Sequence, residues 1–151
     1  MNHNNYLMDG NRMKKIQISI SIATLFFSTA VFSQNSYLCI PDLATGFSYQ
    51  KNIDKWNIST FDVAKNKYIL TKSNTNKWEW KIFGEKYTNV NCDDAFNEHG
   101  YLNCNGFEQI QFNKKNLRFI KIYRLGYVNK GIVGIEGEDT PNMEIGKCSP
   151  L

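Results

Sequence analysis

Residues 107–128, FEQIQFNKKNLRFIKIYRLGYV, decide the fold class that this chain is expected to adopt. Leu117, Phe119 and Tyr123 share one parity in this stretch, and Arg118 falls on the other. A period of two is the signature of a β-strand that packs one face on a core. The four polar residues NKKN interrupt the pattern, and a second alternating run precedes them. We therefore predict a β-hairpin whose second strand is unusually long.

Similar short alternating runs, separated by turn residues, continue along the rest of the chain. Closely spaced strands without a sustained helical period predict an all-β body. We favour a small antiparallel barrel of about eight strands, because each strand then has a neighbour and closure removes exposed edges. A β-sandwich is the alternative. The expected strands are 37–40, 47–50, 56–61, 68–72, 77–83, 107–112, 117–128 and 142–148, with a turn at 41–46, a single helical turn at 93–98 and a Gly-rich piece at 132–137.

The N-terminal region has the three parts of a secretory signal peptide. Lys14 and Lys15 are followed by the apolar run 16–32, and the small residue Ser33 marks the expected cleavage site. The alternative is an uncleaved membrane anchor, but the 17 residues of this run are at the short end of what a spanning helix needs. We expect the leader to be removed, which leaves no membrane span.

This leader divides the chain into three parts. We expect Met13 to be the initiator, with residues 1–12 a start extension that has no role in the fold. Residues 13–33 are the signal peptide, and 34–151 form a single all-β domain of 118 residues. A domain of this size buries about two thirds of its unfolded surface and therefore holds a core.

The charge of the expected domain argues against a nucleic-acid partner. From Gln34 onward the chain contains 15 basic and 13 acidic residues, a net charge of +2. The basic side chains are scattered, and only Arg118 and Arg124 are arginines. Domains that bind nucleic acid need a clustered basic surface and use arginine for bidentate phosphate contacts. We therefore expect no nucleic-acid binding.

The cysteines indicate the compartment. All four follow the leader, and an even count in an exported chain predicts two disulfides and a periplasmic or secreted location. Three pairings are possible. We favour Cys92 with Cys104 across a short loop, and Cys39 with Cys148 at the two ends of the domain. A zinc site is the competing interpretation, but the chain has no CxxC spacing.

Four short motifs stand out in the C-terminal third. They are LRF at 117–119, GYV at 126–128, DTP at 139–141 and the tail EIGKCSPL at 144–151. Together they resemble the tail of small exported proteins found in proteobacteria and their phages. No activity is assigned to that group, so the resemblance implies an exported stand-alone domain and carries over no site residue.

Catalytic signatures are absent from the sequence, which contains no Gly-rich phosphate loop, HExxH or GxSxG. One polar constellation remains, the segment CDDAFNEHG with Asp93, Asp94, Glu98 and His99. These side chains could hold a divalent cation, or supply an acid and a base, if the loop folds inward. We favour a solvated loop in which an aspartate caps a helical turn. We therefore expect neither an enzyme nor a cofactor.

Aromatic residues supply the remaining candidates. Trp78 and Trp80 alternate with charged residues, which favours packing in the core over the lining of a ligand cavity. No such pattern assigns Trp56 and Tyr49, so they are candidate contacts for a ligand or a partner. A barrel of this strand number has room for side chains or for one small ligand.

Three functional hypotheses follow. We favour an exported non-catalytic binding domain that engages a macromolecule of the cell envelope, such as a protein. One form of it is an inhibitor of a wall-degrading enzyme such as lysozyme, in which Glu98, Asp94 or Glu138 enters a basic cleft. That form rests on architecture and compartment alone. The alternatives are a metal-binding protein or metal-dependent enzyme centred on the 92–104 loop, and a lipocalin-like carrier of a small apolar ligand.

Overall fold

The computed structural model describes residues 35–88, 90–128 and 136–151. The predicted start extension and signal peptide, and most of the predicted Gly-rich piece, lie outside the described residues. In these residues the regular secondary structure consists of β-strands, and no helix is present. The strands are β1 Ser36–Gln50, β2 Lys55–Phe61, β3 Tyr68–Lys72, β4 Trp78–Ile82, β5 Val90–Cys92, β6 Tyr101–Gly106, β7 Glu108–Asn113, β8 Arg118–Tyr123 and β9 Asn142–Pro150.

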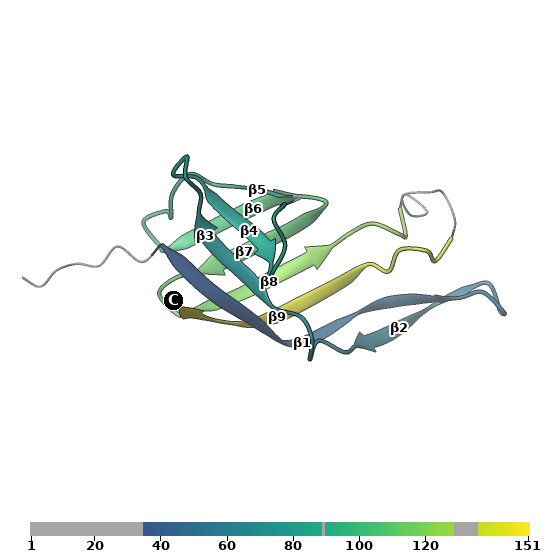
Figure 1. Ribbon diagram of the computed structural model, residues 1–151. Helices are drawn as coiled ribbons and strands as arrows, with labels where there is room; N and C mark the ends of the chain where they lie inside the picture. Colours follow the sequence, from purple (N-terminus) through teal and green to yellow (C-terminus); the bar gives the residue numbers. More distant parts are fainter. Residues whose placement is uncertain (1–34, 89, 129–135) are drawn as a thin grey trace, which may run out of the picture. The chain divides into compact units, whose positions relative to one another are not determined.

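Eight of these strands form a nearly closed antiparallel barrel (Figure 1). Their order is β4-β3-β1-β9-β8-β7-β6-β5, and the chain's first and last strands, β1 and β9, are neighbours in the middle of this order. The ninth strand, β2, pairs only with the second half of β1 in the described residues and continues the hairpin beyond the barrel. The prediction of a small antiparallel barrel is confirmed, and the sandwich alternative is excluded.

The two terminal strands of this order, β4 and β5, close the barrel side by side. No ladder of backbone hydrogen bonds joins them in the residues that the structure describes. A threonine bridges the seam instead: Thr88 Oγ1 donates to the carbonyl oxygen of Trp80 at 2.6 Å and accepts from the backbone N–H of Val90 at 3.3 Å. Side-chain contacts therefore replace a backbone ladder at this seam.

The interior of the barrel is filled by aromatic rings. Tyr68 stacks on Trp80 with ring centroids 5.1 Å apart, and Phe119 lies 5.1 Å from the same indole. Towards the beginning of β1, Phe96 from the loop after β5 packs edge-on against Trp78 at 5.0 Å. Trp78 and Trp80 are buried, as predicted for a core strand. Such ring pairs add about 0.5–1.5 kcal/mol each to the burial of their area.

A continuous first strand replaces the turn that was expected at 41–46. β1 runs through Pro41, and its register with β9 shifts between Pro41 and Leu43. Proline has no N–H for a ladder and is tolerated in a sheet at such irregularities. Gly46 keeps the strand close to its neighbour, because a Cβ there would lie 2.2 Å from the Pro141 carbonyl oxygen. The prediction of a turn was wrong because both residues serve inside a strand.

The predicted hairpin in the 107–128 stretch is confirmed as β7 and β8, but its second strand is shorter than expected. β8 ends at Tyr123, and the chain then turns. Gly126 has φ 110°, and a Cβ there would lie 2.2 Å from the Asp139 carbonyl oxygen. An extended strand cannot pass through a residue with this φ, so the apolar residues that follow Tyr123 belong to a loop.

Both predicted disulfides are formed, Cys39–Cys148 and Cys92–Cys104. In each pair the two cysteines stand directly opposite each other on neighbouring strands, β1 with β9 and β5 with β6. The segment between Cys92 and Cys104 contains the first half of β6, a strand that was not predicted. The expected helical turn at 93–98 is absent, because these residues form bends and turns. Two disulfides are typical of proteins of oxidising compartments.

Candidate binding surface on the outside of the barrel

The hairpin of β1 and β2 exposes apolar side chains on one of its faces. Phe47 is the register partner of Ile58, and Tyr49 is the partner of Trp56. Residues that are directly opposite in an antiparallel pair point to the same side, so all four share one face. Phe47 is 51% exposed and Ile58 is 82% exposed. Large apolar side chains this exposed, and side by side, indicate a contact surface.

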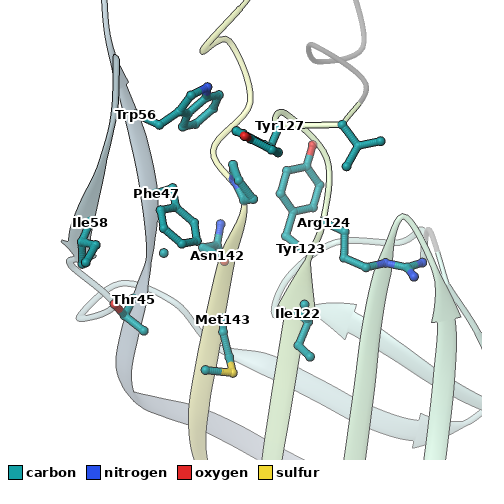
Figure 2. Close-up of a pocket in the computed structure, with 13 residues that line it drawn as sticks. Thr45, Phe47, Trp56, Ile58, Ile122, Tyr123, Arg124, Tyr127, Asn142 and Met143 are labelled. Atoms are coloured by element: carbon teal, nitrogen blue, oxygen red, sulfur yellow. The ribbon is translucent and has the colours of Figure 1, made fainter.

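This face forms one wall of an apolar groove (Figure 2). Figure 2 shows Trp56, Phe47 and Ile58 of the hairpin on one side of the groove and Tyr127 and Tyr123 on the other. The volume of the groove is about 850 Å³. This is within the range of about 300–1,000 Å³ that is usual for ligand sites. The apolar members of the lining include Phe47, Trp56, Ile58, Ile122, Tyr127 and Met143.

Polar contacts position the aromatic walls of this groove. The indole Nε1 of Trp56 donates to Glu136 Oε1 at 2.7 Å, and the ring of Trp56 packs edge-on against Tyr127 at 5.7 Å. The hydroxyl of Tyr123 donates to Asp139 Oδ1 at 3.0 Å. Burial, this hydrogen bond and the negative charge of Asp139 raise the pKa of Tyr123 to about 12. The loop that follows β8 is therefore tied to both sides of the groove.

The residues that the sequence suggested as contacts for a ligand or partner do not all lie at the groove. Trp56 lines the groove, whereas Tyr49 does not line it and packs beside Trp56 with the ring centroids 5.4 Å apart. The hydroxyl of Tyr49 donates to Asp54, and this hydrogen bond raises the pKa of Tyr49 to about 12. Glu138 is exposed in the loop between Glu136 and β9. Phe47, Ile58 and Tyr127 were not predicted as contacts, although each lies in a segment that was predicted to be a strand.

A second, polar hollow adjoins the groove on the outside of the barrel. Its volume is about 500 Å³, and it shares Ile122 with the lining of the groove. Side-chain amides from β6 and β7 supply most of its polar groups. Gln111 Nε2 donates to Asn103 Oδ1 at 3.0 Å, and Asn103 Nδ2 donates to Asp93 Oδ2 at 3.1 Å. The remaining amides of this hollow are Asn105 and Gln109.

The acidic loop does not assemble the metal site that the sequence left open. Asp93 accepts hydrogen bonds from Asn103, and Glu98 pairs at 3.3 Å with the imidazole of His99. Asp94 is exposed. Within the described ranges no group of three or more His, Cys, Asp or Glu side chains is placed to hold a metal ion. The four candidate ligands are thus on the surface and are not brought together.

A buried ion cluster near the start of β3 was not foreseen. Lys121 Nζ lies 2.8 Å from Glu108 Oε1 and 3.1 Å from Glu144 Oε1, and the hydroxyl of Tyr68 donates to Glu144 Oε2 at 2.7 Å. Burial opposes the charge of Lys121, but the hydrogen bond and charge of Glu108, helped by Tyr68 and Glu144, outweigh it and raise the pKa of Lys121. Burial also raises the pKa of Tyr68.

These charges are paired with one another, and the cluster is therefore a structural element of the interior. The sequence contained one indication of this cluster. Lys121 and Glu144 occupy positions that face inward in the alternating pattern of their strands. Lys121 has the same parity as Phe119 and Tyr123 in the 107–128 stretch, but neither Lys121 nor Glu144 was predicted to be buried.

Comparison with protein-family models, curated proteins and solved structures found no match for this chain. The resemblance of the C-terminal tail to small exported proteins therefore stays a prediction. Among the residues described, no helix has the length and apolarity needed to cross a membrane.

Proposed function

We propose that this protein is an exported, non-catalytic binding domain that engages a macromolecule of the cell envelope through the apolar groove. One observation carries the proposal: the groove is open, aromatic and bordered by Ile58, which is 82% exposed. Leaving such side chains in water costs free energy, about 25 cal/mol for each Å² of apolar surface that a partner would cover. The two disulfides support an oxidising compartment, in agreement with the predicted leader.

The filled interior argues against carriage of a small ligand inside the barrel. Leu70, Leu102 and Phe112 are fully buried, and the ring contacts around them occupy the space that a lipocalin-like ligand would need. The metal hypothesis has no cluster of ligands in the described residues. Binding at the outer surface is the function that the geometry favours.

A retention experiment tests the proposal. The mature chain, residues 34–151, is immobilised and exposed to a cell-envelope extract, together with the variants Ile58→Ser and Ile53→Ser. Ile53 is a matched control, since it is also exposed in the hairpin but does not line the groove. We expect the wild type and Ile53→Ser to retain the same macromolecule and Ile58→Ser to lose it. Equal retention by all three proteins, or by none, contradicts the proposal.

Inhibition of a wall-degrading enzyme is the particular form of this function that the acidic loops allow. Glu138 follows the Glu136 that bonds Trp56 of the groove. Glu98 belongs to the loop of Phe96, which contacts Tyr37 near the start of β1. That contact is nine residues from Gly46 of the groove, about 30 Å along an extended strand. Glu138 is therefore closer to the groove than Glu98 and is the better placed of these two to act together with it.

The direct assay measures hydrolysis of cell-wall suspensions by lysozyme with and without the mature chain. If the protein is an inhibitor, Glu138→Gln should weaken inhibition and Glu98→Gln should leave it unchanged. Absence of inhibition by the wild type removes this form and leaves the more general binding function to the retention experiment.

A further inference from the structure

The outer face of the barrel is arranged in two rows of side chains that cross the strands. The first row carries amides on β5, β6 and β7, the second row carries them on β6 and β7, and both rows become largely apolar on β8, β9 and β1. Cross-strand partners share a face, so the members of each row are neighbours. The first row is Asn91, Asn105, Gln109, Ile122, Met143 and Thr45, and the second is Asn103, Gln111, Ile120, Ile145 and Leu43.

The amides of these rows are not explained by strand formation. Asparagine is depleted in β-strands, yet Asn91, Asn103 and Asn105 occupy outward positions of β5 and β6. Residues that break a local preference without a structural gain are expected at functional sites. Asn91, Asn105 and Gln109 make no side-chain hydrogen bond to any other described residue. Their donors and acceptors are available to a ligand.

The amide half and the aromatic half meet in a continuous depression. The polar hollow at Gln109 and the apolar groove at Trp56 share Ile122. From β5 to β1 the first row crosses six strands, about 24 Å at the usual spacing of neighbouring strands. A ligand that follows the rows meets neutral hydrogen-bonding groups first and apolar and aromatic surfaces next. Asp93 is the one carboxylate in the lining of the polar hollow.

We propose that this face binds a chain of N-acetylated sugar rings. The edges of such a ring carry hydroxyl groups that both donate and accept, as a planar amide does. The ring's faces are apolar and fit against an aromatic side chain such as Trp56. The acetamido group combines an amide with a methyl group, which matches the border between Gln109 and Ile122. This inference rests on the proposed function, because it names a glycan as the envelope macromolecule.

Isothermal titration of the mature chain with chitohexaose, and with cellohexaose as a probe that lacks only the acetamido groups, tests the inference. The key variant is Asn105→Thr combined with Gln109→Thr. Threonine favours strands, so the double variant should keep its fold, which its thermal unfolding checks. Asn57→Thr is the matched control, because Asn57 is on the opposite face of the β1–β2 hairpin from Ile58.

We expect chitohexaose to bind the wild type and Asn57→Thr with the same affinity. Its affinity for the double variant should be lower by a factor of about ten or more. The wild type should bind chitohexaose more tightly than cellohexaose. No binding of chitohexaose, equal binding of the two sugars, or undiminished binding by a folded double variant would overturn the inference. If the sugars fail while a protein from the envelope extract is still retained through Ile58, the sugar assignment falls and the proposed function stands.

Discussion

Lys121 is a buried lysine, although lysine side chains are usually exposed. Its side chain is 7% exposed and lies between Glu108 and Glu144. Removing one partner of a buried ion pair leaves the other charged and desolvated. We predict that Lys121→Met lowers the free energy of unfolding by about 3 kcal/mol. Urea denaturation measures the effect.

The control for this prediction is another lysine of the barrel. Lys147 Nζ lies 3.9 Å from Asp42, and both side chains are exposed. Exposed ion pairs contribute about 0–1 kcal/mol. Lys147→Met should therefore change stability by less than about 1 kcal/mol. Similar effects of the two substitutions would show that the buried cluster contributes no more than a surface pair.

Tyr123 gives stability a dependence on alkaline pH. Its pKa in the folded protein is about 12, whereas an unfolded tyrosine has a pKa of about 10. The folded state holds this proton more tightly, so its contribution is complete below about pH 10 and is lost as the pH rises towards 12. We predict that Tyr123→Phe loses less stability than the wild type between about pH 10 and pH 12. Parallel pH profiles from urea denaturation would contradict the prediction.

The two disulfides are the elements that join the strands covalently, and they close loops of different length. Cys39 and Cys148 are 109 residues apart, and Cys92 and Cys104 are 12 apart. In the chain-entropy model these loops correspond to about 5 and about 3 kcal/mol. We predict that replacing the first pair by alanine lowers the free energy of unfolding more than replacing the second.

Calorimetric and urea unfolding of the two double variants checks this order. Both cysteines of the first pair are buried, whereas Cys92 of the second pair is partly exposed, so the loss of packing adds to the entropic difference in the same direction. Equal losses, or a larger loss for Cys92 with Cys104, would contradict the entropic account. A reducing agent added to the wild type should reproduce the sum of the two losses.

At the scale of elements, charged and apolar residues take turns in β4, and this alternation predicted the strand to within one residue at each end. β3 has the predicted bounds although its residues, YILTK, do not alternate in this way; the polar segments on either side define it. β6 was missed because its outward residues, Asn103 and Asn105, are typical of loops. Local composition therefore concealed a strand whose other side, with Leu102 and Cys104, is fully buried.

The candidate groove could be predicted only in part. Trp56 was a candidate because, unlike Trp78 and Trp80, it does not alternate with charged residues and was therefore not assigned to the core. It does line the groove. The exposure of Phe47 and Ile58 depends on whether another segment covers the hairpin, which is a property of tertiary packing that periodicity does not record. Tyr127 was assigned to a strand, since the turn at Gly126 depends on a close approach to Asp139.

At the scale of the whole molecule, neighbouring strands in the order from β4 to β5 are joined by backbone hydrogen bonds, whereas the contact that closes the barrel between β4 and β5 is made by side chains in the described residues. The seam between β4 and β5 relies on Thr88, whose hydroxyl bonds the carbonyl oxygen of Trp80. Valine has nearly the same shape and lacks the hydroxyl. Loss of one such bond costs about 1 kcal/mol, which corresponds to about a fivefold change in local opening.

We therefore predict that Thr88→Val increases native-state hydrogen exchange about fivefold at the amides of β4 and β5, while β8 and β9 keep their protection. Thr71→Val is the control, because the hydroxyl of Thr71 bonds Ser36 and therefore joins β3 to β1 rather than β4 to β5. A Thr88→Val protein with unchanged exchange at β4 and β5, or with a uniform increase in all strands, would show that the barrel is not closed by this side chain. A selective increase would identify the seam as the place where the barrel first opens.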